Sequence, residues 1–168
     1  MVQQRAFTVK SSETNNFQRI GAVSNTRVGS DFEAIARSIL FSAGIVVEPR
    51  FSIPIGIGPF KKGHAFDLGA SIPKILVECK SHRWTTGGNM PSAKMTVWNE
   101  AMYYFALAPE DYRKILFVLR DYSASRGETL AQYYVRRHRH LIPADVEIWE
   151  YDELSKKAEP LAIARIPT

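Results

Sequence analysis

The stretch from His64 to His82 constrains the fold of this chain most, because it places ionisable side chains inside strand-like sequence. It reads HAFDLG from residue 64, continues through a turn near Pro73, and then reads KILVECKSH from residue 74. Two short strand-like runs on either side of a turn are typical of a β-hairpin. The sequence therefore predicts paired strands over residues 64–69 and 75–80, with charged groups on both.

The second of these runs is apolar from Ile75 to Cys79 except for one carboxylate, Glu78. Because successive side chains of a strand point to opposite faces, Glu78 and Lys80 share one face. A carboxylate in a buried strand is costly unless a cation compensates its charge. Lys80 and a metal ion are both candidates for that cation, and Asp67 on the partner strand can supply a second oxygen ligand.

An aspartate followed about ten residues later by Glu-x-Lys resembles the PD-(D/E)XK nuclease superfamily. In that family the Asp and the Glu hold a divalent metal ion, and the Lys lies beside the attacking water. The resemblance implies that Asp67 and Glu78 are metal ligands and that Lys80 is the catalytic lysine. Phe66 stands where the family has its proline, a position that varies within the family.

The expected ligand set consists of Asp67, Glu78 and the backbone carbonyl of Cys79. These hard oxygen atoms suit Mg²⁺ or Mn²⁺ rather than zinc, and two carboxylates suffice because Mg²⁺ keeps most of its water molecules. A bound metal ion would activate a water molecule and neutralise charge on the scissile phosphate. We expect Lys80 to stay protonated beside two carboxylates until the metal arrives. It could then orient the nucleophile or stabilise developing negative charge.

The first helix is predicted from about Asp31 to Ala43, because its apolar residues recur at helical spacing and Gly44 follows it. Ser30-x-x-Glu33 has the pattern of a capping box, in which Glu33 would bond the backbone of Ser30. The family resemblance implies a different role, since a helix before the hairpin often contributes an acid to the site. Both interpretations of Glu33, helix cap and accessory ligand, stay open at this point.

The remaining elements follow from the same patterns. A second capping box, Ser125-x-x-Glu128, predicts where a late helix starts. The other expected elements are an edge strand or irregular loop at 51–60, a largely buried helix at 93–108, a central strand at 115–119, a strand at 146–151 and an edge strand at 161–166. The order over residues 31–120 matches the restriction-endonuclease-like fold. The resemblance thus implies an α/β protein, with a three-layer α/β/α core around a central mixed β-sheet.

Two basic regions are candidates for contacting nucleic acid. Arg83 and Trp84 directly follow the acidic cluster and could bind phosphate and stack on a base. The alternative is a flexible surface loop that one tryptophan anchors. Arg136, Arg137 and Arg139 could form a phosphate-binding patch. They are equally explained as favourable cations at a helix C-terminus.

Composition favours a single globular domain with an anionic partner. The 168 residues carry a net charge of +5, with a sequence pI of about 9.4, and such an excess suits nucleic acid. The single cysteine, Cys79, excludes an internal disulfide. Without an apolar signal core or an eighteen-residue apolar run, we expect a cytoplasmic protein that does not contact a membrane. We expect residues 1–29 to form an N-terminal arm or lead-in, and residues 30–168 to form one nuclease-like domain.

The function expected from these features is that of an Mg²⁺- or Mn²⁺-dependent endodeoxyribonuclease, a phosphodiester hydrolase of restriction, repair or recombination type. Its expected partners are DNA and a second copy of the chain, since an enzyme that cuts both strands often works as a homodimer. One alternative is a non-catalytic nucleic-acid-binding module on the same fold. Another is a buried ion-pair network with a purely structural role in an unrelated α/β protein.

Overall fold

A six-stranded mixed sheet forms the centre of the computed structural model, which describes residues 25–163. The strand order is β1-β2-β3-β4-β7-β8, in which β3, β4 and β7 run parallel and every other neighbouring pair is antiparallel. The strands are β1 (Glu48–Ile57), β2 (Phe60–Ser71), β3 (Lys74–Lys80), β4 (Arg113–Leu119), β7 (Val146–Asp152) and β8 (Lys157–Pro160).

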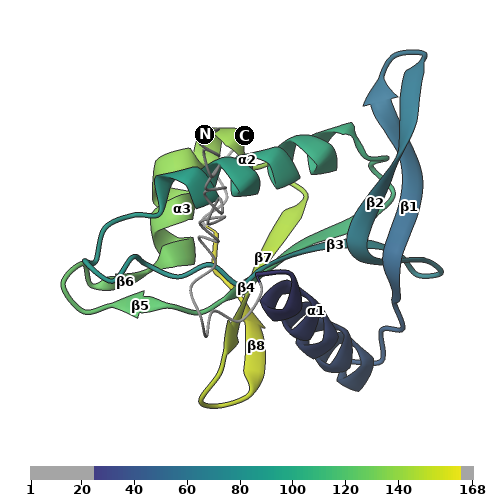
Figure 1. The fold of residues 1–168 in the computed structure, drawn as a ribbon. Helices are drawn as coiled ribbons and strands as arrows, with labels where there is room; N and C mark the ends of the chain where they lie inside the picture. The colour runs from purple at the N-terminus through teal and green to yellow at the C-terminus, as the bar shows by residue number, and fades with distance from the viewer. Residues whose placement is uncertain (1–24, 164–168) are drawn as a thin grey trace, which may run out of the picture.

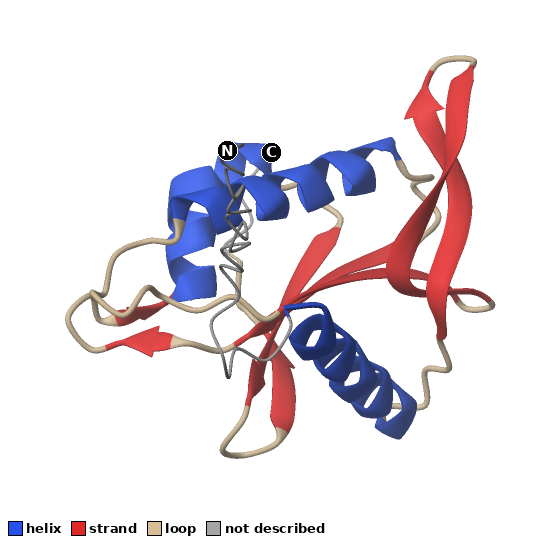
Figure 2. Cartoon of the chain, in the orientation of Figure 1, coloured by secondary structure: helices blue, strands red, loops and turns tan. Residues whose placement is uncertain are grey.

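Helices cover both faces of this sheet (Figure 1). Helix α1 (Asn25–Ser42) lies on one face, whereas α2 (Ser92–Leu107) and α3 (Leu130–His138) lie on the other. A two-stranded ribbon of β5 (Tyr122–Ser123) and β6 (Glu128–Thr129) precedes α3 (Figure 2), and a 3₁₀ turn, η1 (Arg139–Leu141), follows it. The expectation of an α/β protein with a central mixed sheet is confirmed. None of the helices within residues 25–163 has the length and apolar character needed to span a membrane.

The apolar stripe expected on the first helix is what packs α1 onto the sheet. Phe32, Ala36 and Leu40 are buried, and they meet a cluster of strand side chains that includes Val77 and Phe117. The rings of Phe32 and Phe117 lie 5.5 Å apart. Burying a large apolar side chain stabilises the fold by roughly 1.5–3 kcal/mol, so this stripe contributes strongly to the packing of α1.

The continuous apolar strand expected at 115–119 is the middle of the sheet. Its side chains, Ile115 to Leu119 of β4, are all buried because helices cover both faces. On the α2 side the cluster is filled by the largest side chains of α2, Trp98 and Phe105, and by Tyr134 of α3.

Helix α1 begins at Asn25, five residues before Ser30. Ser30 therefore lies inside the helix and is not its N-cap, so the capping-box interpretation of Glu33 is wrong. Val28 continues the helical spacing of the stripe four residues before Phe32, and the helix runs through Gly29 between them, a residue that costs a helix interior only about 1 kcal/mol relative to Ala. Residues 25–29 belong to the helix rather than to an arm. The rest of the predicted arm, residues 1–24, lies outside the described residues.

One prediction in the C-terminal part was also wrong, and a second is tested only in part. Helix α3 is capped by Thr129, whose Oγ1 accepts from the backbone N of Gln132 at 3.1 Å, and the Gln132 side chain accepts in return from Thr129 N at 2.8 Å. The Ser125 motif instead lies in the turn between β5 and β6, where Gly127 adopts φ 69°. The last described strand is β8, while the expected strand at 161–166 falls partly outside the described residues.

The pairing of β1 with β2 is interrupted at one point, and this interruption positions the polar side chains of the candidate site. Pro49 pairs with Leu68 and Phe51 with Phe66, but Arg50 and Asp67 between them are unpaired, and Arg50 adopts φ 54°. Leu68 packs in the α1-side cluster, whereas Phe66 packs in the α2-side cluster. The hairpin thus turns from one side of the sheet to the other at this point, and its distal part projects beyond the sheet (Figure 1).

Candidate active site

The candidate site lies where β2 leaves β3. Pairing between these strands ends at Leu68 and Val77, one residue before Asp67 and Glu78. Beyond that point the carboxylate of Asp67 replaces the lost strand contact, since its Oδ2 accepts from the backbone N of Cys79 at 2.7 Å. The break therefore opens the end of β3 and holds an acid beside it.

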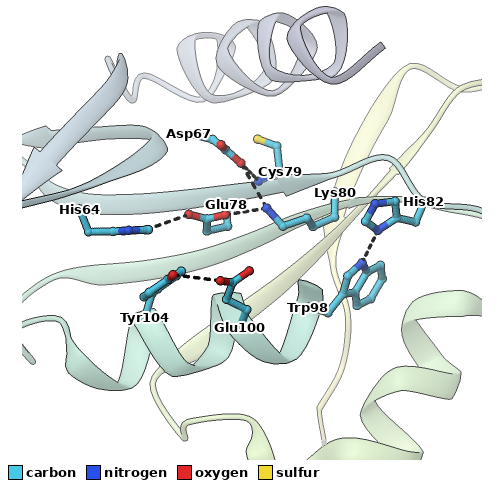
Figure 3. Close-up of polar contacts among 9 residues, drawn as sticks. All are labelled: His64, Asp67, Glu78, Cys79, Lys80, His82, Trp98, Glu100 and Tyr104. Carbon is cyan, nitrogen blue, oxygen red and sulfur yellow. Dashed lines mark hydrogen bonds and ion pairs between the residues drawn. The ribbon is translucent and has the colours of Figure 1, made fainter. Parts of the chain in front are cut away.

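Three charged side chains converge at this opening (Figure 3). The ammonium of Lys80 lies 2.6 Å from Glu78 Oε2 and 3.5 Å from Asp67 Oδ2. The side chains of Lys80, Glu78 and Asp67 are 13%, 9% and 27% exposed, so the cluster is only partly hydrated. As the strand pattern predicted, Lys80 and Glu78 share a face. One cation is thus shared by two carboxylates at the C-terminal end of β3.

Burial controls the ionisation of this cluster. It raises the pKa of Glu78, and the attraction of Lys80 does not cancel that effect because the charge of Asp67 opposes it. Burial would by itself lower the pKa of Lys80, but the carboxylates of Glu78 and Asp67 outweigh it and hold that pKa above its usual value. Lys80 is therefore a firmly protonated cation, while the negative charge of Glu78 is only partly compensated. A further cation would be favourable here.

Glu33 of α1 belongs to the same electrostatic neighbourhood. Burial raises its pKa most, the negative charges of Asp67 and Glu78 raise it further, and Lys80 lowers it. These effects require Glu33 to lie near the three charged groups at the end of β3. With Ser30 inside the helix, the capping role is excluded, and the role of Glu33 as an accessory acid stays a prediction.

Sequence reasoning missed His64. Its Nε2 lies 3.6 Å from Glu78 Oε1, and its ring packs against that of Tyr104 with 3.9 Å between centroids. The Nε2 atom is buried and has no hydrogen-bond partner among the described residues. Tyr104 in turn donates to Glu100 Oε1 at 3.0 Å. No local pattern pairs residue 64 with residue 78, because only the turn of the hairpin at Asp67 brings them together.

His82, just after β3, is committed to a structural contact. Its Nδ1 accepts from Trp98 Nε1 at 2.8 Å (Figure 3). Burial lowers the pKa of His82 to about 4, and the nearby charges of Lys94 and Lys80 lower it further. The ring is therefore neutral at physiological pH, and it ties the segment that leaves Lys80 to helix α2.

The structure gives Trp84 the anchoring role that was one of its two interpretations. Its backbone N donates to Asp121 Oδ2 at 2.7 Å, and its indole Nε1 donates to the backbone oxygen of Asp121 at 3.0 Å. Arg83 beside it is half exposed and pairs with Glu153 at 2.5 Å and with Asp121 at 3.7 Å. Among the described residues, neither side chain forms a hydrogen bond or ion pair with Asp67, Glu78 or Lys80.

The three arginines near the end of α3 do not form a continuous free patch. Arg136 forms a two-pronged pair with Glu128 at 2.6 and 3.1 Å, and Arg139 donates from Nη1 to the carbonyl of Ile142 at 3.0 Å. Arg137 is exposed. In Figure 1 helix α3 and the distal β1–β2 hairpin lie at opposite ends of the molecule. Within residues 25–163, none of the three arginines forms a hydrogen bond or ion pair with Asp67, Glu78 or Lys80.

The donor set fits a hard divalent cation and not a zinc ion. Within residues 25–163 no three His, Cys, Asp or Glu side chains are grouped so that they could hold a metal ion. Two carboxylates already surround the cationic Lys80 ammonium, however, and Mg²⁺ needs only one or two carboxylates because it keeps its waters. Burial raises the pKa of the Cys79 thiol well above its usual value, so the sulfur stays protonated and only its backbone carbonyl is a candidate ligand.

The chain was compared with known protein families, with curated proteins and with solved structures, and none of the three comparisons gives a match. The resemblance to PD-(D/E)XK nucleases therefore rests on Asp67, Glu78 and Lys80 and on the setting of these residues.

Proposed function

We propose that this chain is a divalent-metal-dependent endodeoxyribonuclease that hydrolyses DNA phosphodiester bonds. The observation that carries the proposal is the convergence of Asp67, Glu78 and Lys80 at the point where β2 leaves β3. A lysine shared by two carboxylates, one of them buried with a raised pKa, is typical of a functional site.

The architecture supports this proposal. A six-stranded mixed sheet with helices on both faces is compatible with a restriction-endonuclease-like three-layer core. The cluster also lies at the C-terminal end of β3, which runs parallel to β4. In α/β sheets, ligands bind outside the carboxyl ends of the parallel strands.

The roles of the residues follow from their positions. Asp67, Glu78 and the Cys79 carbonyl would hold Mg²⁺ or Mn²⁺, which when bound supplies neutralisation of phosphate charge and activation of water. Lys80, protonated and close to both carboxylates, would orient the nucleophile and donate a hydrogen bond to the charge that develops on the phosphate. Glu33, with its raised pKa, would accept or hold a proton at the edge of the site.

The net charge of +5 supports DNA as the partner. A homodimer, a cytoplasmic location and a role in restriction, repair or recombination are consistent with this proposal and extend it. Each of them stays a prediction.

Cleavage of supercoiled plasmid tests the proposal directly. Wild-type protein is expected to nick or linearise the plasmid with Mg²⁺ or Mn²⁺ and to leave it intact with EDTA, and Lys80→Ala is expected to abolish cleavage. Lys74→Ala is the matched control, because Lys74 is an exposed lysine of the same strand that pairs with Asp111 far from the cluster.

A wild-type protein that cuts neither plasmid nor branched, flapped or single-stranded DNA would contradict the nuclease proposal. DNA binding that persists without metal would then favour the non-catalytic binding module. Absence of both activities, with a marked loss of stability in Lys80→Ala, would favour a structural ion-pair network.

A further inference from the structure

The distal β1–β2 hairpin has an unusual charge. Residues 50–66 carry Arg50, Lys61 and Lys62 and no acidic residue, a formal charge of +3 within a chain whose total is +5. Within the described part of the chain, neither Lys61 nor Lys62 forms a salt bridge, in contrast to Arg83 and Arg136. The hairpin therefore presents uncompensated positive charge.

The tip of this hairpin is also apolar. Ile57 and Phe60 face each other in its last strand pair, and they are 67% and 84% exposed. Nearer the sheet, Ile53 and Ile55 of the same face are buried against the α2-side cluster. The apolar face thus continues from buried residues to exposed ones. The hairpin that carries it projects from the body of the protein (Figure 1).

One face of β2 connects the candidate site with this tip. His64, next to Glu78, is followed on the same face by Lys62 and then by Phe60, which pair across the hairpin with Ile53, Ile55 and Ile57. Two strand residues span about 7 Å, so Lys62 and Phe60 lie about 7 and 14 Å along the strand from His64. Nucleotides of one DNA strand rise about 3.4 Å each. Lys62 and Phe60 are therefore spaced to meet DNA about two and four nucleotides from a phosphate bound at Glu78.

We propose that the distal β1–β2 hairpin is a DNA-binding arm that holds the duplex flanking the scissile phosphate. Lys62 contacts a phosphate from the face that it shares with Phe60, and Lys61 contacts a phosphate from the opposite face of the ribbon. Phe60 with Ile57 forms an apolar contact with base edges or between base pairs. A two-stranded ribbon of this kind fits the major groove of B-DNA. This inference rests on the proposed nuclease function, and it assigns the flanking contacts to the hairpin rather than to α3.

The β7–β8 hairpin supplies a matched control. It carries the exposed lysines Lys156 and Lys157 and the exposed apolar side chain Leu154, which is 94% exposed. Unlike the distal β1–β2 hairpin it also contains five acids, Glu147, Glu150, Asp152, Glu153 and Glu159, so its formal charge is −3. Its lysines should contribute little to binding a polyanion.

The test is fluorescence anisotropy of a labelled DNA duplex with EDTA present, which separates binding from cleavage. Lys61→Ala/Lys62→Ala is expected to weaken affinity about tenfold and to reduce the slope of log Kd against log salt by about 1.8, since each lost phosphate contact removes about 0.9. Phe60→Ser is expected to weaken affinity several-fold with an unchanged slope, because it removes no phosphate contact. Lys156→Ala/Lys157→Ala should leave affinity and slope as in the wild type.

An equal loss of DNA affinity in Lys61→Ala/Lys62→Ala and Lys156→Ala/Lys157→Ala, or no loss in either variant, would overturn the proposal of a DNA-binding arm. So would failure of the wild type to bind any duplex. Light scattering that shows a dimer only when Phe60 is present would assign the tip to self-association instead, and Phe60-dependent sedimentation with anionic vesicles would assign it to a lipid surface. Hairpin-dependent binding without any metal-dependent cleavage would refute the nuclease while leaving the arm intact.

Discussion

Two largely buried lysines, Lys114 of β4 and Lys80 of β3, differ in the exposure of the acids with which they pair. Lys114, the second residue of β4, is 3% exposed and pairs at 2.5 Å with Asp145, a residue that is 44% exposed. Lys80, the last residue of β3, pairs with two carboxylates, one of which is only 9% exposed. The strand register places the two lysines four residues apart, about 13 Å, toward opposite ends of the sheet.

The difference lies in the acids. Asp145 keeps contact with water, so its carboxylate loses little solvation, and its charge compensates the buried ammonium of Lys114. Glu78 is buried deeply enough that its pKa is raised despite its salt bridge with Lys80. Proteins keep such costly arrangements mainly where function requires them. The comparison therefore indicates a stabilising role for Lys114, whereas a functional role for Lys80 is what the proposed nuclease activity predicts.

The largest expected effect is on cleavage. Lys80→Met keeps the length of the side chain and removes the ammonium, so the rate of DNA cleavage should fall about 10²–10⁴-fold, the range over which a positioned proton-transfer or charge-stabilising group acts. Lys114→Met should change the rate less than about twofold per unit of folded protein, because its pair lies away from the site. Single-turnover cleavage rates, normalised to folded protein by circular dichroism, measure both. Similar losses of cleavage rate in Lys80→Met and Lys114→Met would contradict the different roles given to the two lysines.

The second largest effect is expected on metal binding, which should depend on Asp67 and not on Asp145. At ten times its Kd, a divalent cation stabilises the folded state by about 1.4 kcal/mol, which raises the melting temperature by about 3–5 °C in a chain of this size. We expect Mn²⁺ or Ca²⁺ to do so in the wild type and in Asp145→Asn but not in Asp67→Asn.

The metal affinity itself should rise with pH. Glu78 and Glu33 both have raised pKa values, so protons compete with the metal until the pH passes those values. Calorimetric titrations at several pH values measure this dependence. A metal affinity that does not change with pH would show that Glu78 and Glu33 do not bind the metal.

The smallest effect concerns stability as a function of pH. In the unfolded chain Glu78 ionises near its ordinary value of 4.5, whereas burial raises its pKa in the folded protein. The folded state therefore binds more protons between the two values, and this group's contribution to stability is lost as pH rises through the folded pKa. Glu78→Gln should remove the loss of stability that ionisation of Glu78 causes, and should therefore stabilise the protein at neutral pH by about 1 kcal/mol.

Asp145→Asn, in contrast, should destabilise the protein, because it leaves the buried ammonium of Lys114 without a compensating carboxylate. Urea unfolding at several pH values compares the two variants. A Glu78→Gln protein less stable than the wild type at neutral pH would show that Glu78 is primarily a structural ion-pair partner.

Local patterns in the sequence determined much of the framework. The helical spacing of Phe32, Ala36 and Leu40 predicted the buried stripe of α1, and the continuous apolar run from Ile115 to Leu119 predicted the central strand. The alternation of strand side chains placed Glu78 and Lys80 on one face. These features depend on residues within a few positions of one another, so the sequence alone contains the information.

Only the tertiary structure decided which charges meet. The break at Arg50 and Asp67 depends on pairing among three strands, and it alone brings His64 to Glu78. Helix starts were mispredicted where two capping motifs competed, since Thr129 rather than Ser125 caps α3.

The basic residues show the same limit. Asp121 anchors Trp84 from 37 positions along the chain, and Lys80 meets Asp67 from 13 positions away. Whether a cation is free for DNA or bound to a carboxylate depends on such distant contacts. Local periodicity carries no information about them, because it describes which face a side chain occupies and not what lies opposite that face in the folded chain.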